Sequence, residues 1–98
     1  MIIRVPRGAT NPRVMMQQAG YYEFRDPNTG ETSFVRRLSV NFYPRFHVYI
    51  QDEGDQRRIS LHLDQKQASY QGHTKHSGEY SGPLVEEEAA RIYQAVTR

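Results

Sequence analysis

The sequence predicts one α+β domain, in which an antiparallel sheet of four to five strands packs one face against a single C-terminal helix. Three observations support this fold class. Segments 21–36 and 45–64 each show alternating apolar and polar residues on both sides of a polar turn, which is typical of a β-hairpin. Residues 83–97 carry apolar side chains at helical spacing. Because 98 residues provide for one hydrophobic core, residues 1–98 are expected to form a single domain.

The N-terminal region is expected to contain a short strand and a short helix. Residues 2–5 are β-prone, and Pro6 is expected to end the strand because proline has no backbone N–H to donate. Asn11 suits the N-cap position of a helix and Pro12 suits its first turn. These signals predict one or two helical turns over residues 12–19, with a loop leading into a strand as the alternative.

The first hairpin covers residues 21–36. It turns where Asp26 precedes a proline, a sequence that favours a type I turn. We expect Asp26 to pair with Glu31 across this turn. In that register Tyr22 lies opposite Val35.

The second hairpin, 45–64, has the clearest alternation. Its apolar side chains are expected to point to one face: Phe46, Val48, Ile50, Ile59, Leu61 and Leu63. Its polar side chains are expected to point to the other: Arg45, His47, Tyr49, Arg58, Ser60, His62 and Asp64. A two-residue turn at Glu53 and Gly54 pairs Val48 with Ile59. A slip of one residue would separate the two apolar sets, so the faces are strongly specified.

The C-terminal helix, 83–97, is expected to begin at Pro83, because proline suits the first helical position and the preceding Gly82 or Ser81 suits the N-cap. Its apolar residues recur at intervals of three or four: Val85, Ala89, Ile92 and Val96. This stripe is expected to cover the apolar face of the second hairpin.

Composition limits the chemistry of the protein. The chain contains no cysteine, which excludes disulfides, thiolate metal sites and cysteine nucleophiles, and favours a cytoplasmic location. No stretch approaches the ~20 apolar residues of a membrane span. Hydrophobic residues make up 37% of the chain, which predicts a thin core and makes homodimerisation one way to bury more apolar surface.

Histidine supplies the main candidate site. The four histidines fall within thirty residues of sequence, at positions His47, His62, His73 and His76. The predicted hairpin places the first two on its polar face beside Asp64. Segment 65–82 shows neither strand nor helix periodicity, and such long irregular segments are often functional. We therefore expect a ligand-binding site on the open sheet face that combines strand and loop residues: His47, His62, Asp64, His73, His76 and Glu79.

These residue types suggest two kinds of chemistry. Imidazole and carboxylate bind divalent transition metals such as Zn, Mn, Fe or Ni, and the candidate metal ligands are His62, Asp64, His73 and His76. Their spacing matches no known metal motif, and solvated histidines are the alternative interpretation. The same groups could act as acid and base without a metal, although no nucleophile-elbow motif is present.

Arginine and tyrosine on the polar face provide a third interpretation. A surface that interleaves rings with guanidinium groups can bind single-stranded nucleic acid, and its expected members are Tyr21, Arg36, Arg45, Tyr49 and Arg58. The chain has no RNA-recognition consensus, and such residues are also ordinary on an exposed strand. The leading hypothesis is therefore a non-enzymatic binding module, followed by a metal-dependent or acid–base enzyme and then by a nucleic-acid binder.

Three short segments resemble a group of small bacterial proteins of unknown activity. They are YPRFH at 43–47, LHLDQK at 61–66 and HSGEY at 76–80. The resemblance covers roughly the C-terminal half of the chain. It implies a bacterial, cytoplasmic protein and assigns no functional residue.

Overall fold

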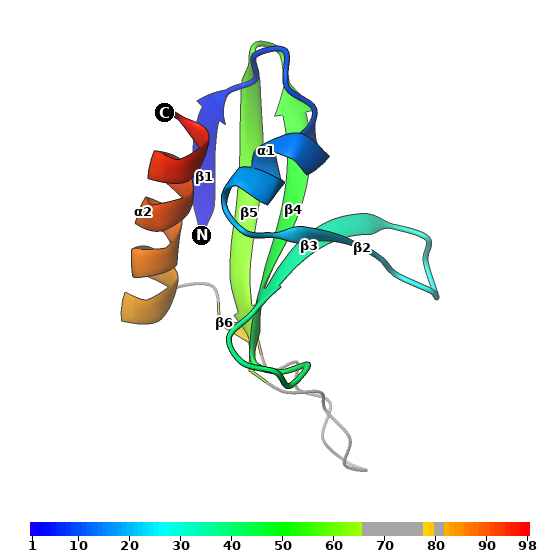
Figure 1. Cartoon of the computed structure of the whole chain (residues 1–98). Helices are drawn as coiled ribbons and strands as arrows, with labels where there is room; N and C mark the ends of the chain where they lie inside the picture. The colour runs from blue at the N-terminus through cyan, green and yellow to red at the C-terminus, as the bar shows by residue number, and fades with distance from the viewer. Residues whose placement is uncertain (66–77, 80–81) are drawn as a thin grey trace.

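The fold, seen in a computed structural model that describes residues 1–65, 78–79 and 82–98, is α+β as predicted (Figure 1). Its elements follow in the order β1 (Ile2–Pro6), α1 (Pro12–Gln18), β2 (Tyr22–Arg25), β3 (Thr32–Arg37), β4 (Arg45–Glu53), β5 (Gln56–Asp64), β6 (Gly78–Glu79) and α2 (Pro83–Val96). All strands pair antiparallel in one sheet of order β1-β5-β4-β3-β2, and the short β6 pairs with the end of β5. No helix among the described residues is long and apolar enough to cross a membrane.

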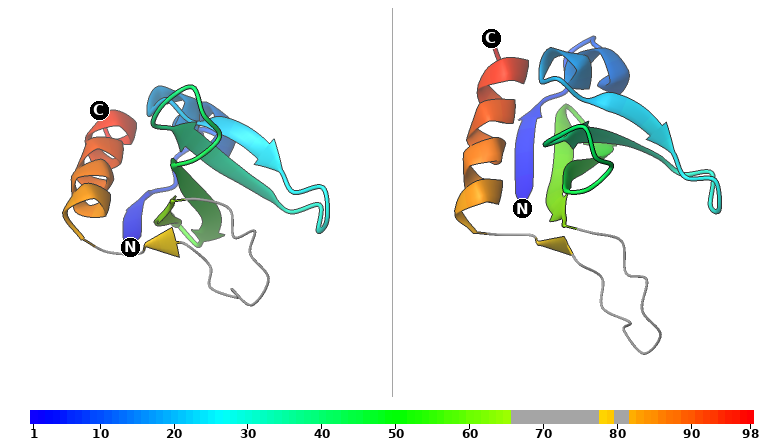
Figure 2. Two further views of the ribbon diagram at one scale, coloured as in Figure 1. Left: turned by 90° about the horizontal axis from the view of Figure 1, so that it is seen from below. Right: turned by 60° about the horizontal axis from the view of Figure 1, so that its bottom comes forward.

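One hydrophobic core lies between the sheet and the two helices. The sheet contributes the predicted apolar face together with residues of β1 and β3: Ile3, Val5, Phe34, Phe46, Val48, Ile59, Leu61 and Leu63. Helix α2 contributes its predicted stripe, in which Val85 and Ile92 are fully buried. Helix α1 adds Met15 and Met16, so the core has a second helical cover beyond the single helix predicted. Figure 2 shows the β2–β3 hairpin projecting away from the helix α2 end of the sheet.

Local signals placed the N-terminal helix and the first hairpin correctly. The side chain of Asn11 accepts a hydrogen bond from the backbone N–H of Val14 at 2.9 Å and caps α1. In the first hairpin the N–H of Asp26 donates to the carbonyl of Glu31 at 2.9 Å. Tyr22 accordingly lies opposite its predicted partner on β3.

The second hairpin has a different register from the one predicted. Its two turn residues are Gly54 and Asp55, so Val48 pairs with Leu61 rather than with Ile59. Gly54 has φ +66°, and glycine at the first turn position fits the type II′ turn that hairpins favour. The correction moves each cross-strand partner by two residues. Since side chains alternate with period two, the predicted apolar and polar faces are retained.

A buried polar cluster ties α2 to the N-terminal half of the chain. Glu88 is only 4% exposed. Its carboxylate accepts a hydrogen bond from the Tyr21 hydroxyl at 2.6 Å and forms ion pairs with Arg91 at 2.8 Å and Arg36 at 3.4 Å. Arg91 also donates to the carbonyl of Ala19 at 2.6 Å. These donors compensate the carboxylate for its loss of water.

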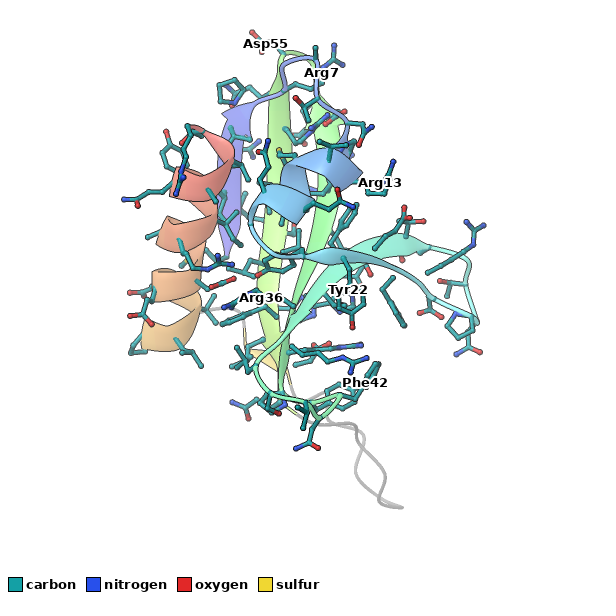
Figure 3. All side chains as sticks on the ribbon, in the orientation of Figure 1. Arg7, Arg13, Tyr22, Arg36, Phe42 and Asp55 are labelled. Carbon is teal, nitrogen blue, oxygen red and sulfur yellow. The ribbon has the colours of Figure 1, made fainter. Side chains whose placement is uncertain are left out.

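This cluster corrects one sequence prediction. Tyr21 and Arg36 were expected on the polar face with Arg45, Tyr49 and Arg58, but both contact Glu88 on the helix side of the sheet. Figure 3 shows Arg36 extending toward α2. The alternation along β3 explains the difference, because Arg36 lies opposite the core residue Phe46.

Candidate functional site

The sheet face opposite the helices gathers four polar side chains of β4 and β5. In the observed register His47 lies directly opposite His62, and Arg45 lies directly opposite Asp64. Residues two apart on a strand share a face, so all four side chains belong to the same surface. The corrected turn therefore brings the two histidines closer than the diagonal arrangement in the predicted register.

Asp64 is the centre of this group. Its Oδ2 lies 3.1 Å from Nδ1 of His47, and its Oδ1 lies 2.9 Å from Nε2 of His62. The Nε of Arg45 donates to Oδ2 at 3.3 Å. One potential metal-ligand atom from each of His47, His62 and Asp64 lies within 4.8 Å of the others. We refer to these three residues as the His/Asp cluster.

Ser33 on β3 orients the His47 ring from the opposite side. Its Oγ lies 2.7 Å from Nε2 of His47, and the residue is only 3% exposed. The same hydroxyl lies 3.5 Å from the carbonyl oxygen of Phe24, at the limit of hydrogen-bonding distance. Both ring nitrogens of His47 therefore have partners. Sequence analysis did not identify Ser33, because no local signal shows how β3 pairs with β4.

Aromatic rings pack around the cluster. The His47 ring lies 4.7 Å from the Tyr49 ring and 4.9 Å from the His62 ring, measured between centroids. Phe24 meets His47 edge-on at 6.4 Å. His47 is buried as a result, whereas His62 and Asp64 remain partly exposed. A ligand would therefore reach the cluster from the side of His62 and Asp64.

Arg45 is buried, whereas the sequence analysis expected it on an accessible surface. It is 5% exposed. Its guanidinium carbon lies 4.2 Å from the ring centroid of Phe42, 4.9 Å from that of Tyr43 and 5.1 Å from that of Phe24. Its Nη1 is buried and has no hydrogen-bond partner among the residues that the structure describes. Phe42, labelled in Figure 3, lies in the loop that precedes β4.

The hydrogen bonds keep Asp64 ionised. Partial burial by itself would raise the pKa of Asp64, but the hydrogen bonds from His47 and His62, together with the positive charge of these rings when protonated, outweigh it. The net effect holds the pKa of Asp64 well below its usual range. The carboxylate is therefore available at neutral pH as a partner for a cation.

The remaining predicted site residues are only partly placed. His73, His76 and the side chain of Glu79 lie outside the described residues. The backbone of β6 pairs Gly78 with Asp64, which brings the returning chain beside the cluster. Arg58 lies toward the other end of the sheet, where it donates to Gln51 at 2.7 Å. With Arg45 enclosed, the predicted arginine and tyrosine residues do not form one accessible basic surface.

The distances in the cluster match two chemical arrangements. Ser33, His47 and Asp64 follow the hydroxyl–imidazole–carboxylate order of a serine hydrolase. However, the buried Ser33 hydroxyl lies between neighbouring strands, where a substrate would not reach it. A metal ion between the imidazoles and the carboxylate needs access only from the side of His62 and Asp64, whose side chains are 12% and 20% exposed, and this second arrangement fits the observed burial better.

Comparisons with known proteins do not bear on this choice, because no family model, curated protein or solved structure matches the chain.

Proposed function

We propose that the protein is a small binding module whose His/Asp cluster holds a divalent transition-metal ion. The observation that carries this proposal is the convergence of one ring nitrogen of His47, one ring nitrogen of His62 and an Asp64 oxygen, which all lie within 4.8 Å of one another. Two imidazoles and one carboxylate are a common ligand set for Zn²⁺, Fe²⁺ and related ions. His73 and His76 remain candidates for further ligands.

The contact between Ser33 and His47 supports the metal interpretation. A metal-binding histidine usually donates its second ring N–H to a nearby acceptor, which fixes the tautomer and the ring orientation. The contacts of His47 allow two arrangements: Nδ1 donates its proton to Asp64, 3.1 Å away, while Nε2 accepts from Ser33, or Nε2 donates to Ser33 while the lone pair of Nδ1 faces the ionised carboxylate. Two facing acceptors repel each other unless a cation lies between them. A proton or a metal ion can fill that position, and the second imidazole beside Asp64 favours a metal ion.

The proposal includes a bacterial, cytoplasmic setting, which the sequence resemblance implies. The proposed metal site is also compatible with the enzyme hypothesis. Three protein ligands leave at least one coordination position open, as in catalytic zinc sites, so a reaction at the bound ion would use the same residues. The enclosure of Arg45 lends no support to nucleic-acid binding by this face.

Metal titration tests the proposal. Tag-free protein is treated with a chelator, and Zn²⁺, Co²⁺, Ni²⁺ and Mn²⁺ are added separately in a calorimeter. We expect at least one ion to bind with 1:1 stoichiometry. Asp64→Asn and His62→Gln should weaken that binding by more than the roughly 10–100-fold that loss of an outer hydrogen bond costs.

Asp55→Asn is the matched control, because Asp55 lies in the exposed hairpin turn at the far end of β5. It should bind the ion like the unmodified protein. Failure of all four ions to bind, or equal affinity in Asp64→Asn, would contradict the proposal. A double His73→Gln, His76→Gln variant shows whether these histidines add ligands.

A further inference from the structure

A divalent ion in the His/Asp cluster would give the site an excess of positive charge. The imidazoles of His47 and His62 would bind the ion as neutral ligands, so Asp64 supplies the negative charge within this set. The same carboxylate is also the ion-pair partner of Arg45, which is 5% exposed. One carboxylate would therefore face both a doubly charged ion and a buried guanidinium. Buried charges need partners, so the metal-loaded site requires another anion to balance its positive charge.

Arg45 also has an unused hydrogen-bond donor. Its Nε bonds to Asp64, whereas its buried Nη1 has no acceptor within the described ranges. Buried donors in proteins are almost always paired, so an unpaired one beside a candidate metal site points to a ligand that supplies the acceptor. A guanidinium has the planar donor arrangement that suits carboxylate and phosphate oxygens.

The sheet determines where such a ligand would lie. All three residues of the His/Asp cluster project from one face of β4 and β5, so the open coordination positions point away from that face. Arg45 is the direct cross-strand neighbour of Asp64. A ligand oxygen on the metal would consequently lie on the same surface as the guanidinium. Because Nη1 is buried and the Phe42 ring lies nearer to the guanidinium than the rings of Tyr43 and Phe24, we expect the Phe42 ring, which is 41% exposed, to move when the ligand contacts Nη1.

We propose that the metal-loaded cluster binds an oxyanion, of the phosphate or carboxylate class, with one oxygen on the ion and another contact to Arg45. This inference rests on the proposed metal-binding function. It specifies the class of ligand that the open coordination side accepts, and it gives Arg45 a role in binding that ligand.

Cobalt spectroscopy provides the test. Protein carrying one equivalent of Co²⁺ is titrated with inorganic phosphate and, in a separate series, with acetate, while the visible absorption of the cobalt ion is recorded. We expect at least one of these anions to change the spectrum saturably. Arg45→Met should weaken that anion roughly 10-fold or more, as expected for loss of a hydrogen bond to a charged group. Arg45→Lys, which keeps the charge but loses the planar donors, should weaken it less.

Arg4→Lys is the control, since Arg4 is an exposed arginine on β1 that pairs with Glu53 at 2.6 Å. Its anion affinity should match that of the unmodified protein. A cobalt spectrum that neither anion alters would overturn this inference and leave the metal proposal standing, whereas failure of Co²⁺, Zn²⁺, Ni²⁺ and Mn²⁺ alike to bind would overturn the metal proposal itself. Equal anion affinity in Arg45→Met would remove the role of Arg45. If Arg45→Met does not fold, equal anion affinity in Arg45→Lys and in the unmodified protein would likewise remove the role of Arg45.

Discussion

At the residue scale, a single carboxylate organises the candidate site. Asp64 contacts two imidazoles and one guanidinium, and each contact comes from a side chain on the same sheet face. The alternation of β4 and β5 made His47, His62 and Asp64 predictable as neighbours, because period two assigns them to one face in either hairpin register. The contribution of Ser33 was not predictable, since it depends on how β3, a separate hairpin strand, pairs with β4.

Replacing Ser33 separates the metal interpretation from a purely structural one. In Ser33→Ala the Nε2 of His47 loses its partner at 2.7 Å, so the ring is held less firmly in the orientation that directs Nδ1 at the metal. We expect metal affinity to fall roughly 10–100-fold in calorimetric titration. Ser60→Ala, a serine substitution on the same face of β5, should leave the affinity unchanged. Unchanged affinity in Ser33→Ala would show that Ser33 does not orient a ligand.

At the scale of the elements, local sequence signals were sufficient to predict the helices and hairpins, but they did not predict how these elements contact one another. Caps, turns and periodicity predicted α1, α2 and both hairpins. The second turn was misplaced by one residue because Gly54 suits both the second position of a type I′ turn and the first position of a type II′ turn. The observed turn avoids a positive φ at Glu53, which the type I′ placement would require. Glu88 pairs with Arg91 three residues along the same helix, but its other two partners, Arg36 and Tyr21, lie 52 and 67 residues away in sequence. No local pattern encodes such contacts.

The burial of Glu88 makes α2 sensitive to its loss. Glu88→Ala leaves Arg36 and Arg91 without their carboxylate and the Tyr21 hydroxyl without its acceptor. We expect the free energy of unfolding to fall by about 1–3 kcal/mol, because the buried Tyr21 hydroxyl is left unpaired, whereas the side chains of Arg36 and Arg91 are 34% and 41% exposed and can be solvated. Urea denaturation measures this change. The neighbouring Glu87 is exposed, so Glu87→Ala should cost less than about 0.5 kcal/mol.

At the scale of the whole molecule, two clusters of polar residues lie on opposite faces of the sheet and differ in their surroundings. The His/Asp cluster lies on the open face, where His62 and Asp64 are partly exposed and would be accessible to the proposed ligand. The Glu88 cluster lies under α2, where it joins the N-terminal third of the chain to the C-terminal helix. A substitution in the Glu88 cluster should therefore change global stability. A substitution of His62 or Asp64, the partly exposed members of the His/Asp cluster, should mainly change metal binding.

Alkaline unfolding tests this division through Tyr21. Burial, followed by the hydrogen bond to Glu88 and the charge of Glu88, raises the pKa of Tyr21 far above its ordinary value near 10, although Arg91 and Arg36 act in the opposite direction. The folded protein thus keeps this hydroxyl protonated at a pH where the unfolded chain releases the proton. Stability is retained below pH ~10 and falls above it, by up to about 1.4 kcal/mol per pH unit.

Urea denaturation between pH 8 and pH 11 measures this dependence. Tyr21→Phe should be less stable than the unmodified protein at pH 8, because Glu88 loses a donor, but it should lose less stability on going to pH 11. Tyr93→Phe, at an exposed position of α2, should keep the full pH dependence. The same slope in Tyr21→Phe as in the unmodified protein would mean that other groups cause the alkaline loss. Metal affinity at pH 8 should be equal in the folded forms of all three proteins, since Tyr21 lies on the face away from the His/Asp cluster.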